Sequence, residues 1–270
     1  MKKKFRTLEV SDPAYESDNL RFVTVKSNYL KGRGDCTFFI PPQLQTIKRP
    51  VPVVVLLHGV YGSHWAWTYN INVHKIASGM IGSGEIEPMV LLMPSDGLMG
   101  DGSGYFDHGE KNFEKWIVKD VLALIAEVIP NQANQEVFIA GLSMGGYGAL
   151  RLMAKYPALF AGASGLSSIT CLTDLLPFLA RDERIAFRSK FDEEELVTII
   201  RKNKKRLPPF RFDCGTDDPL FTSNLKLHKQ LDEAGITHEF EIFEGGHSNA
   251  YWTDNIGKTL VFFDSIAKNK

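Results

Sequence analysis

The stretch FIAGLSMGGYGALRLMAKYP, residues 138–157, carries the signal that decides the fold. An apolar run leads into Ser143, which is set among glycines, and apolar residues then return at helical spacing. The residues around this serine match the pattern G-x-S-x-G, in which a nucleophilic serine occupies a sharp, strained turn between a strand and a helix. Gly141 and Gly145, two positions either side, avoid clashes with neighbouring backbone. The stretch predicts a reactive serine whose hydroxyl projects above a sheet.

Glycine-rich turns between a strand and a helix also bind phosphate groups, which gives this stretch a second interpretation. A phosphate-binding loop needs G-x-x-x-x-G-K-[ST], and a dinucleotide-binding fold needs G-x-G-x-x-G. No lysine follows these glycines, and neither spacing is present. The nucleophile interpretation is therefore favoured.

Continuous apolar runs closed by glycine or proline surround this stretch, and they are typical of strands buried on both faces of a parallel sheet. Two earlier runs, at 20–27 and 36–42, predict a pair of antiparallel strands that precede the parallel part of the sheet. Helical periodicity occurs at 63–80, at 112–130 before Pro130, after Ser143, and from about Tyr251 to Ile266. The later predicted strands are VPVVVLLHG (51–59), PMVLLMPSD (88–96), EVFIAG (136–141), FAGASGLSS (160–168), FRFDCGT (210–216) and HEFEIFEG (238–245).

This alternation predicts an α/β fold, with a mainly parallel central sheet, antiparallel N-terminal strands and helices on both faces. The part from 171 to 207 departs from the rhythm, and we expect a helical insertion over one end of the sheet. The chain has 270 residues, and α/β folds reach about 250 residues around one core. We expect a single domain over residues 1–270.

A reactive serine needs a base to accept its proton and a third group to orient that base. In folds with this turn, the chain order is serine, acid, histidine. Three of the seven histidines follow Ser143. His228 and His238 lie within a predicted helix and strand, where surface or edge positions are the simpler account. His247 lies in EGGHSNAYW, between the last strand and the last helix, and a loop there reaches the edge where parallel sheets keep their active sites.

The acid is expected after an intermediate strand, and FRFDCGTDDPL offers three aspartates. Asp213 falls inside the strand pattern, which leaves Asp217 and Asp218 in the turn. The residues alone do not separate these two, and either carboxylate also suits a polar turn or a helix cap.

The composition excludes several classes of function. With 44% hydrophobic residues and a formal net charge of −1, the chain has no basic field for nucleic acid or an anionic membrane surface. No apolar run approaches the roughly 20 residues of a membrane span, and no uninterrupted apolar segment follows the basic start. The three cysteines are widely spaced without a C-x-x-C pair, which favours reduced thiols and a cytoplasmic location. Homo-oligomerisation stays open.

Five segments together resemble one family, the esterases of the esterase D type within the α/β-hydrolases, and most closely its small bacterial tributyrin esterases. The family also includes S-formylglutathione hydrolases and feruloyl esterases. In that family the acid falls three residues after the glycine of a G-x-x-D turn, which here selects Asp218, with Asp217 as the fallback. The resemblance also implies two oxyanion donors, the backbone N–H groups of Val60 and Met144, and makes His58 a loop-shaping residue. The five segments are VVVLLHGVYGS, LLMPSDG, FIAGLSMGGYGALRLMAKYP, CGTDDPL and EGGHSNAYW.

Aromatic residues near the first loop are the candidates for a substrate pocket, since ligand pockets are mostly apolar. Tyr61, Trp65 and Tyr105 are the expected pocket residues, whereas Trp67 is expected in the core. No metal or cofactor is expected, because neither the histidines at 58, 64 and 74 nor the aspartates of 96–107 match a known metal spacing.

The expected function is a serine carboxylesterase that hydrolyses short-chain acyl or small aryl esters through an acyl-enzyme. One alternative is an acetyl or feruloyl sugar-ester esterase. A second is a thioesterase like S-formylglutathione hydrolase, although HGVYG replaces the S-G-L-T of those enzymes. Acyl transfer to an alcohol and a catalytically silent binding protein are further alternatives.

Overall fold

The computed structural model describes residues 4–129, 135–184 and 195–268 of the chain. They form a nine-stranded sheet in the order β1-β2-β3-β5-β4-β6-β7-β8-β9. The pairs β1–β2, β2–β3 and β3–β5 are antiparallel, and every later pair is parallel. The strands are β1 (Leu8–Val10), β2 (Leu20–Ser27), β3 (Gly32–Phe39), β4 (Val53–Leu57), β5 (Val90–Pro94), β6 (Val137–Leu142), β7 (Gly162–Leu166), β8 (Phe210–Gly215) and β9 (Glu239–Phe243).

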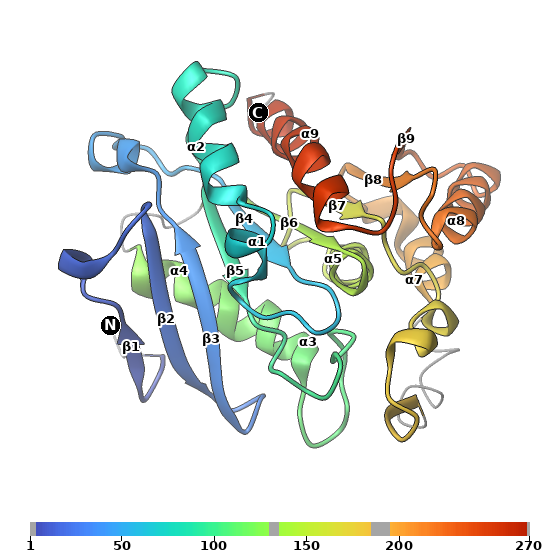
Figure 1. Cartoon of the computed structure of the whole chain (residues 1–270), viewed down its shortest axis with the longest axis horizontal. Coiled ribbons are helices and arrows are strands. Elements are labelled where there is room, and N and C mark those ends of the chain that lie inside the picture. The colour runs from blue at the N-terminus through green and yellow to red at the C-terminus, as the bar shows by residue number, and fades with distance from the viewer. Residues whose placement is uncertain (1–3, 130–134, 185–194, 269–270) are drawn as a thin grey trace.

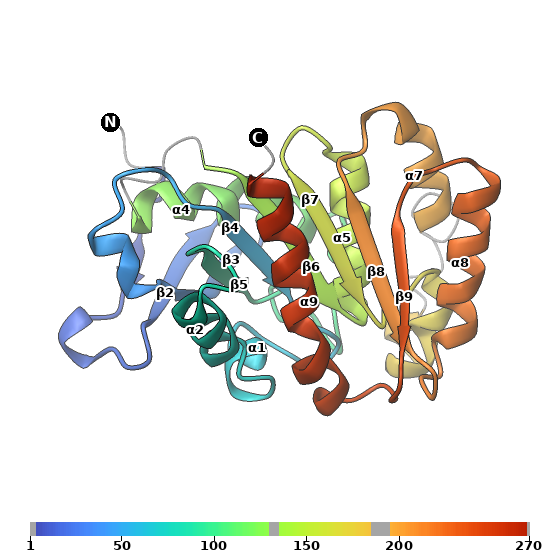
Figure 2. The same cartoon turned by 90° about the horizontal axis from the view of Figure 1, so that it is seen from above.

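Helices cover both faces of the sheet (Figures 1 and 2). One face carries α3, α4, α5, α7 and α8, and the other carries α1, α2 and α9. This arrangement confirms the α/β-hydrolase fold with an antiparallel N-terminal edge. The helices are α1 (Ala66–Tyr69), α2 (Val73–Ser83), α3 (Phe113–Lys115), α4 (Leu122–Val128), α5 (Met144–Lys155), α7 (Leu196–Asn203), α8 (Phe221–Glu233) and α9 (Asn249–Lys268).

The central strand β4 shows why its apolar run is continuous. Val53, Val55 and Leu57 pack into the core on the α5 side, whereas Val54 and Leu56 pack into the core on the α9 side. Successive side chains of a strand point to opposite faces, so a strand covered on both faces needs apolar residues at every position. All five of its residues are buried.

Two predicted helices are interrupted. The helix expected at 63–80 is split into α1 and α2, because Asn72 adopts a left-handed conformation with φ of 61° between them. The helix expected at 112–130 starts where the Asn112 side chain accepts a hydrogen bond from the Lys115 N–H, and it contains a π-helical turn, Trp116–Val121, between α3 and α4. Pro130, expected to stop this helix, lies outside the described residues.

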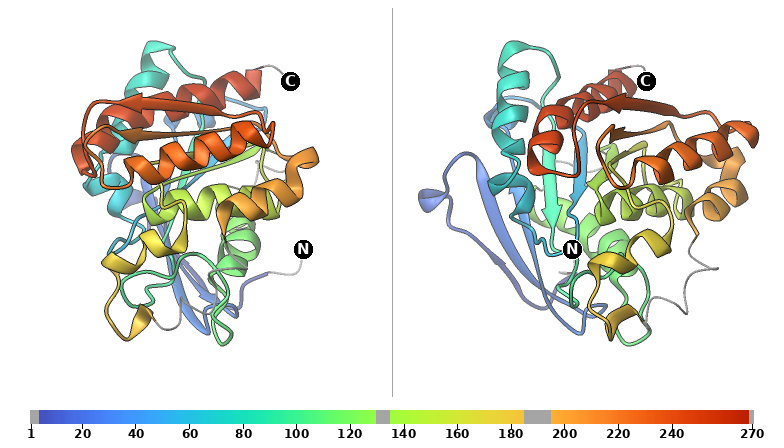
Figure 3. Two further views of the ribbon diagram at one scale, coloured as in Figure 1. Left: turned by 90° about the vertical axis from the view of Figure 1, so that its right-hand side faces the viewer. Right: turned by 45° about the vertical axis from the view of Figure 1, so that its right-hand side comes forward.

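The region expected as a helical insertion, 171–207, contains short 3-10 turns, Leu172–Asp174 and Leu176–Phe178, followed by α7. The first two turns extend beyond one end of the sheet, and α7 packs beside α5 and α8 (Figure 3). Residues 185–194 of this region lie outside the described residues. Among the described helices, none combines the length and the apolar character that crossing a membrane requires.

Candidate active site

Ser143 lies at the turn between β6 and α5, in the strained conformation that the motif predicts. Its φ and ψ are 53° and −119°, and a positive φ is uncommon for a residue with a side chain. The flanking glycines are required sterically. A Cβ at Gly141 would lie 2.1 Å from the carbonyl oxygen of Gly145, and one at Gly145 would lie 2.2 Å from that of Leu57.

Backbone hydrogen bonds hold this turn against the neighbouring strand. The Ser143 N–H donates to the carbonyl of Leu166 at the end of β7, over 3.0 Å, and the Ser143 carbonyl accepts from the Ile169 N–H over 3.1 Å. Hydrogen bonds from both backbone groups of Ser143 to the end of β7 and the segment after it therefore hold the strained conformation in place.

His247 and Asp218 meet Ser143 at the carboxyl edge of the sheet. The Oγ of Ser143 lies 3.0 Å from Nε2 of His247, and Nδ1 of the same ring lies 2.8 Å from Oδ2 of Asp218. A carboxylate can only accept, so the proton belongs on Nδ1 and the lone pair on Nε2 faces the serine hydroxyl. The structure brings together the three residues that the sequence selected from distant segments.

The two adjacent aspartates differ in burial and in hydrogen-bond partner. The Asp218 side chain is buried, and its second oxygen, Oδ1, accepts from the Leu220 N–H over 2.8 Å. Asp217 is exposed, and its N–H donates to the carbonyl of Gly245. Asp218 is thus the carboxylate on the histidine, and Asp217 belongs to the turn that holds the histidine loop.

Aromatic rings fix the orientation of His247. Phe178 is stacked on it with ring centroids 6.0 Å apart, and Trp252 meets it edge-on at 5.0 Å. Neither residue is among those that the sequence predicted for the site. Phe178 lies in the irregular region after β7, where the sequence has no periodicity from which contacts could be predicted. Trp252 lies in α9, and its sequence position gives no sign that it differs from the other apolar residues of that helix.

The loop after β4 is shaped by His58, as expected. Its Nε2 accepts a hydrogen bond from the Asp96 N–H over 2.9 Å, so its Nδ1 carries the proton that is donated to the carbonyl of Gly59 over 2.7 Å. His58 is 2% exposed and bridges two loops. A Cβ at Gly59 would lie 3.4 Å from the Cβ of Ser143, which places this loop directly against the serine.

The two expected oxyanion donors lie on either side of Ser143. Val60 follows Gly59 in the loop, and Met144 is the first residue of α5. Within the described part of the chain, neither N–H donates to a protein acceptor. The Met144 N–H belongs to the first turn of a helix, where backbone donors have no partner inside the helix and attract negative charge.

A pocket of about 280 Å³ opens beside Ser143 and His247. Its lining includes four aromatic side chains, those of Tyr61, Trp65, Phe178 and Trp252. The Tyr61 hydroxyl donates to the Phe178 carbonyl, which ties the first loop to the region after β7. The structure therefore brings two of the three expected pocket residues, Tyr61 and Trp65, to the pocket.

The third expected pocket residue, Tyr105, is not part of the pocket lining. It is fully buried beneath the first loop, where its hydroxyl donates to the His58 carbonyl over 2.9 Å. A Cβ at Gly148 of α5 would lie 2.6 Å from its ring, so Tyr105 packs between the loop and the helix. Trp67 is also buried, as expected, and its Nε1 donates to the Leu57 carbonyl.

A buried charge network underlies the histidine loop. Asp213 of β8 accepts a hydrogen bond of 2.8 Å from the Tyr251 hydroxyl, and its other oxygen lies 3.0 Å from the Arg211 guanidinium. Burial raises the pKa of Asp213 to about 6, although Arg211 and Tyr251 favour its charged form. Tyr251 opens α9 just after His247, so this network anchors the helix that follows the loop.

Comparisons with other proteins show what the chain as a whole is similar to. A family model described as "Putative esterase" matches residues 27–263. An acetyl esterase of Caldicellulosiruptor saccharolyticus is 28% identical over 232 residues, which cover 78% of this chain and 83% of that protein. An esterase of Mycobacterium tuberculosis is 30% identical over 239 residues; the match covers 77% of this chain but only 51% of that protein.

Solved structures share the fold. A ferulic acid esterase superposes with a TM-score of 0.79 at 24% identity, covering 96% of this chain and 99% of that one. An S-formylglutathione hydrolase from Staphylococcus aureus superposes with a TM-score of 0.76 at 18% identity, covering 95% and 98%.

Proposed function

Because this chain belongs to the esterase family and is a carboxylic ester hydrolase, we propose that it acts through a triad of Ser143, His247 and Asp218. One observation carries the proposal: the unbroken set of contacts from Ser143 Oγ to His247 Nε2 and from His247 Nδ1 to Asp218. Together with the strained turn, these contacts supply a nucleophile, a base and an orienting carboxylate.

The proposed reaction proceeds through an acyl-enzyme. Ser143 Oγ attacks the ester carbonyl as His247 Nε2 takes the serine proton, and the same nitrogen then gives that proton to the departing alcohol. Asp218 holds the ring in the productive tautomer and stabilises the imidazolium. Water, activated by His247, then releases the acid and regenerates the serine.

The backbone N–H groups of Val60 and Met144 are proposed to stabilise the oxyanion. Both flank the serine, and neither is used by a protein acceptor among the described residues. Preorganised donors aimed at the developing charge need no reorganisation during the reaction, and the loss of one such donor costs about 10²–10³ in kcat. The hydrogen bonds of His58 would keep the Val60 side of this site in place.

The pocket favours a small substrate. Its volume of about 280 Å³ lies just below the range of roughly 300–1,000 Å³ typical of small-molecule sites. We therefore propose esters with short-chain acyl or small aryl groups. The acetyl esterase relative is consistent with the first class.

Esters of aromatic acids, including feruloyl sugar esters, are a second candidate. The specific observation in their favour is the set of aromatic side chains around the pocket, Tyr61, Trp65, Phe178 and Trp252, because aromatic rings stack well on one another. Acetylated sugars are the other sugar-ester candidate. A thioesterase activity has no comparable support beyond the shared fold.

Hydrolysis of p-nitrophenyl esters tests the proposal. Acetate, butyrate, octanoate and benzoate would be compared at equal enzyme concentration, followed by acetylated and feruloylated sugars. We expect activity to fall from butyrate to octanoate, because the pocket is small. Equal or higher kcat/KM on octanoate would refute the short-chain assignment, and inactivity on every ester would refute the triad proposal itself.

We further propose that residues 1–270 function as one domain, because the sheet runs without a break from β1 to β9. We also propose that the protein works in a reducing compartment, because all three cysteines are free thiols.

A further inference from the structure

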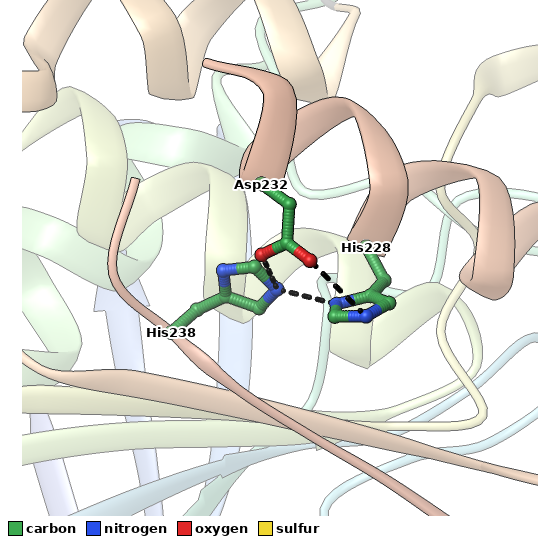
Figure 4. A group of neighbouring side chains, drawn as sticks. All are labelled: His228, Asp232 and His238. Carbon is green, nitrogen blue, oxygen red and sulfur yellow. Dashed lines mark hydrogen bonds and ion pairs between the residues drawn. The ribbon is translucent and has the colours of Figure 1, made fainter. Parts of the chain in front are cut away.

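A second group of reactive side chains lies near the end of α8 and the turn that leads into β9. His228 and Asp232 are one helical turn apart on α8, so they leave the helix on the same side. His238 returns to them from the segment before β9. Figure 4 shows the three side chains pointing toward one another, and one ligand atom from each lies within 4.8 Å of the other two. None of them lines the pocket at Ser143.

His238 is oriented as a ligand. Its Nδ1 lies 2.8 Å from the Ile236 carbonyl, which can only accept, so this nitrogen carries the proton. The lone pair on its Nε2 therefore faces His228, whose Nδ1 is 2.9 Å away. At metal centres, a ligating histidine commonly donates its other N–H to a backbone carbonyl in this way, which fixes both its tautomer and its ring orientation.

Aromatic packing holds both rings in place. His238 is stacked on Phe212 with centroids 5.5 Å apart, and His228 is stacked on Phe240 at 4.8 Å. The exposed fractions differ: 1% for the His238 side chain, 31% for His228 and 60% for Asp232. The cluster therefore has a dry, rigid side formed by the phenylalanines and an open side where water can complete a coordination sphere.

These groups converge on a point between them that a cation could occupy. His238 Nε2 and the Asp232 carboxylate are both electron-pair donors, and the carboxylate lies 3.4 Å from His228 Nε2 and 3.9 Å from His238 Nε2. A proton on Nδ1 of His228 satisfies His238 Nε2 alone, whereas a metal ion between the side chains would accept electron pairs from both groups. Zinc accepts imidazole and carboxylate ligands at about 2.0–2.2 Å in tetrahedral geometry, so its ligand atoms are roughly 3.3 Å apart. The closest approaches, 2.9, 3.4 and 3.9 Å, involve both nitrogens of His228 and both oxygens of Asp232. One ligand atom from each residue lies within 4.8 Å of the other two, so small side-chain rotations would bring three ligand atoms to the spacing that zinc needs.

We propose that His228, Asp232 and His238 form a binding site for a divalent transition metal ion, with zinc as the expected occupant and water as the fourth ligand. The ion would join α8 to the segment that enters the edge strand β9. This site is separate from the ester chemistry, and its expected effect is on the stability of this edge of the fold.

Zinc titration of the chelator-treated full-length protein tests the site, by calorimetry for stoichiometry and by thermal unfolding. We expect one zinc ion per chain at this site and a rise in Tm of about 5 °C or more at zinc concentrations roughly 100-fold above the Kd. The double variant His228→Gln/Asp232→Asn should lose the rise. Glu233→Gln, which removes the same charge from the exposed neighbouring position on α8, should keep it.

A third variant, His247→Ala, distinguishes zinc binding at the α8 cluster from zinc binding at the pocket. It alters the pocket and leaves the α8 cluster intact. The rise in Tm should persist in this variant. The proposal is overturned if the intact protein shows no zinc-dependent rise, if the double variant keeps the full rise, or if the rise disappears in His247→Ala instead.

Discussion

Oδ2 of Asp218 lies 2.8 Å from Nδ1 of His247, whereas the adjacent Asp217 carries an exposed side chain and donates its backbone N–H to the carbonyl of Gly245 in the histidine loop. Two neighbouring carboxylates of identical chemistry therefore have different environments. The buried one is hydrogen-bonded to the imidazole, and the exposed one lies in the turn.

Replacing each aspartate by asparagine should give very different enzymes. Asp218→Asn should lower kcat by about 10³–10⁴, because an amide can stabilise the wrong imidazole tautomer. Asp217→Asn should change kcat by less than about threefold, since its backbone N–H is retained. Steady-state rates on p-nitrophenyl butyrate measure both, and an equal loss in the two variants would exclude the assignment of Asp218.

His58→Ala should lower kcat more than it changes KM, because the loop carrying Val60 loses its two bridging hydrogen bonds. A loss of about 10–100-fold is expected, up to the lower end of the effect of deleting one oxyanion donor. The control is His74→Ala, which removes another buried histidine, on α2, whose Nδ1 has no hydrogen-bond partner among the residues that the structure describes. Similar losses of kcat in both variants would point to general destabilisation instead.

Gly145→Ala should prevent stable folding or displace the elbow, since the new Cβ would lie 2.2 Å from the Leu57 carbonyl oxygen. Gly79→Ala is the matched substitution. Its Cβ would meet nothing within 4 Å on the exposed side of α2, and alanine is favoured over glycine in a helix by about 0.5–1 kcal/mol. In urea unfolding, the free energy of unfolding should fall in Gly145→Ala and rise in Gly79→Ala, relative to the wild type. A stable, fully active Gly145→Ala protein would contradict the elbow packing.

Asp213 should make stability depend on pH. Its folded-state pKa of about 6 is higher than its ordinary value of 3.8, so the folded state holds the proton more tightly than the unfolded state. The wild type should therefore lose stability as pH rises through about 6. Relative to Asp213→Asn, which does not titrate, the loss between pH 5 and pH 7.5 should be about 1 kcal/mol.

Urea unfolding of both proteins at both pH values measures this difference. A relative gain in wild-type stability at the higher pH would mean that Arg211 dominates over burial.

Trp65→Ala should reduce selectivity for aryl esters. KM for p-nitrophenyl benzoate should rise about tenfold, which corresponds to about 1.4 kcal/mol of lost binding, while KM for the acetate should change little. Tyr69→Ala is the control, because Tyr69 is another exposed aromatic residue nearby on α1 that does not line the pocket. If the two variants behave alike, Trp65 does not contact the substrate.

The fold was predictable from the sequence where the pattern is locally determined. The short apolar runs at 53–57 and 137–142, closed by glycine, predicted buried strands. The steric demands of the elbow specify Gly141 and Gly145 individually. The position of His247 could also be predicted, because a loop between a strand and a helix lies at the carboxyl edge of a parallel sheet.

Residues whose positions depend on long-range packing were not predictable. Tyr105 was expected in the pocket with the other aromatic candidates, but its ring is buried between the loop after β4 and α5. Phe178 comes from an irregular segment with no periodic signal. The sequence placed His228 in a helix and His238 in a strand. The turn after α8 brings Nδ1 of His228 within 2.9 Å of Nε2 of His238, and this turn was not predicted.

Covalent labelling of the serine is the most direct test of the central claim, that Ser143 attacks the ester carbonyl. The protein would be treated with an alkyl fluorophosphonate, digested and analysed by mass spectrometry. The account predicts one adduct per chain, on the peptide that contains Ser143, with loss of esterase activity in proportion to labelling and no adduct in Ser143→Ala. An adduct on a different residue, or full esterase activity in Ser143→Ala, would contradict it.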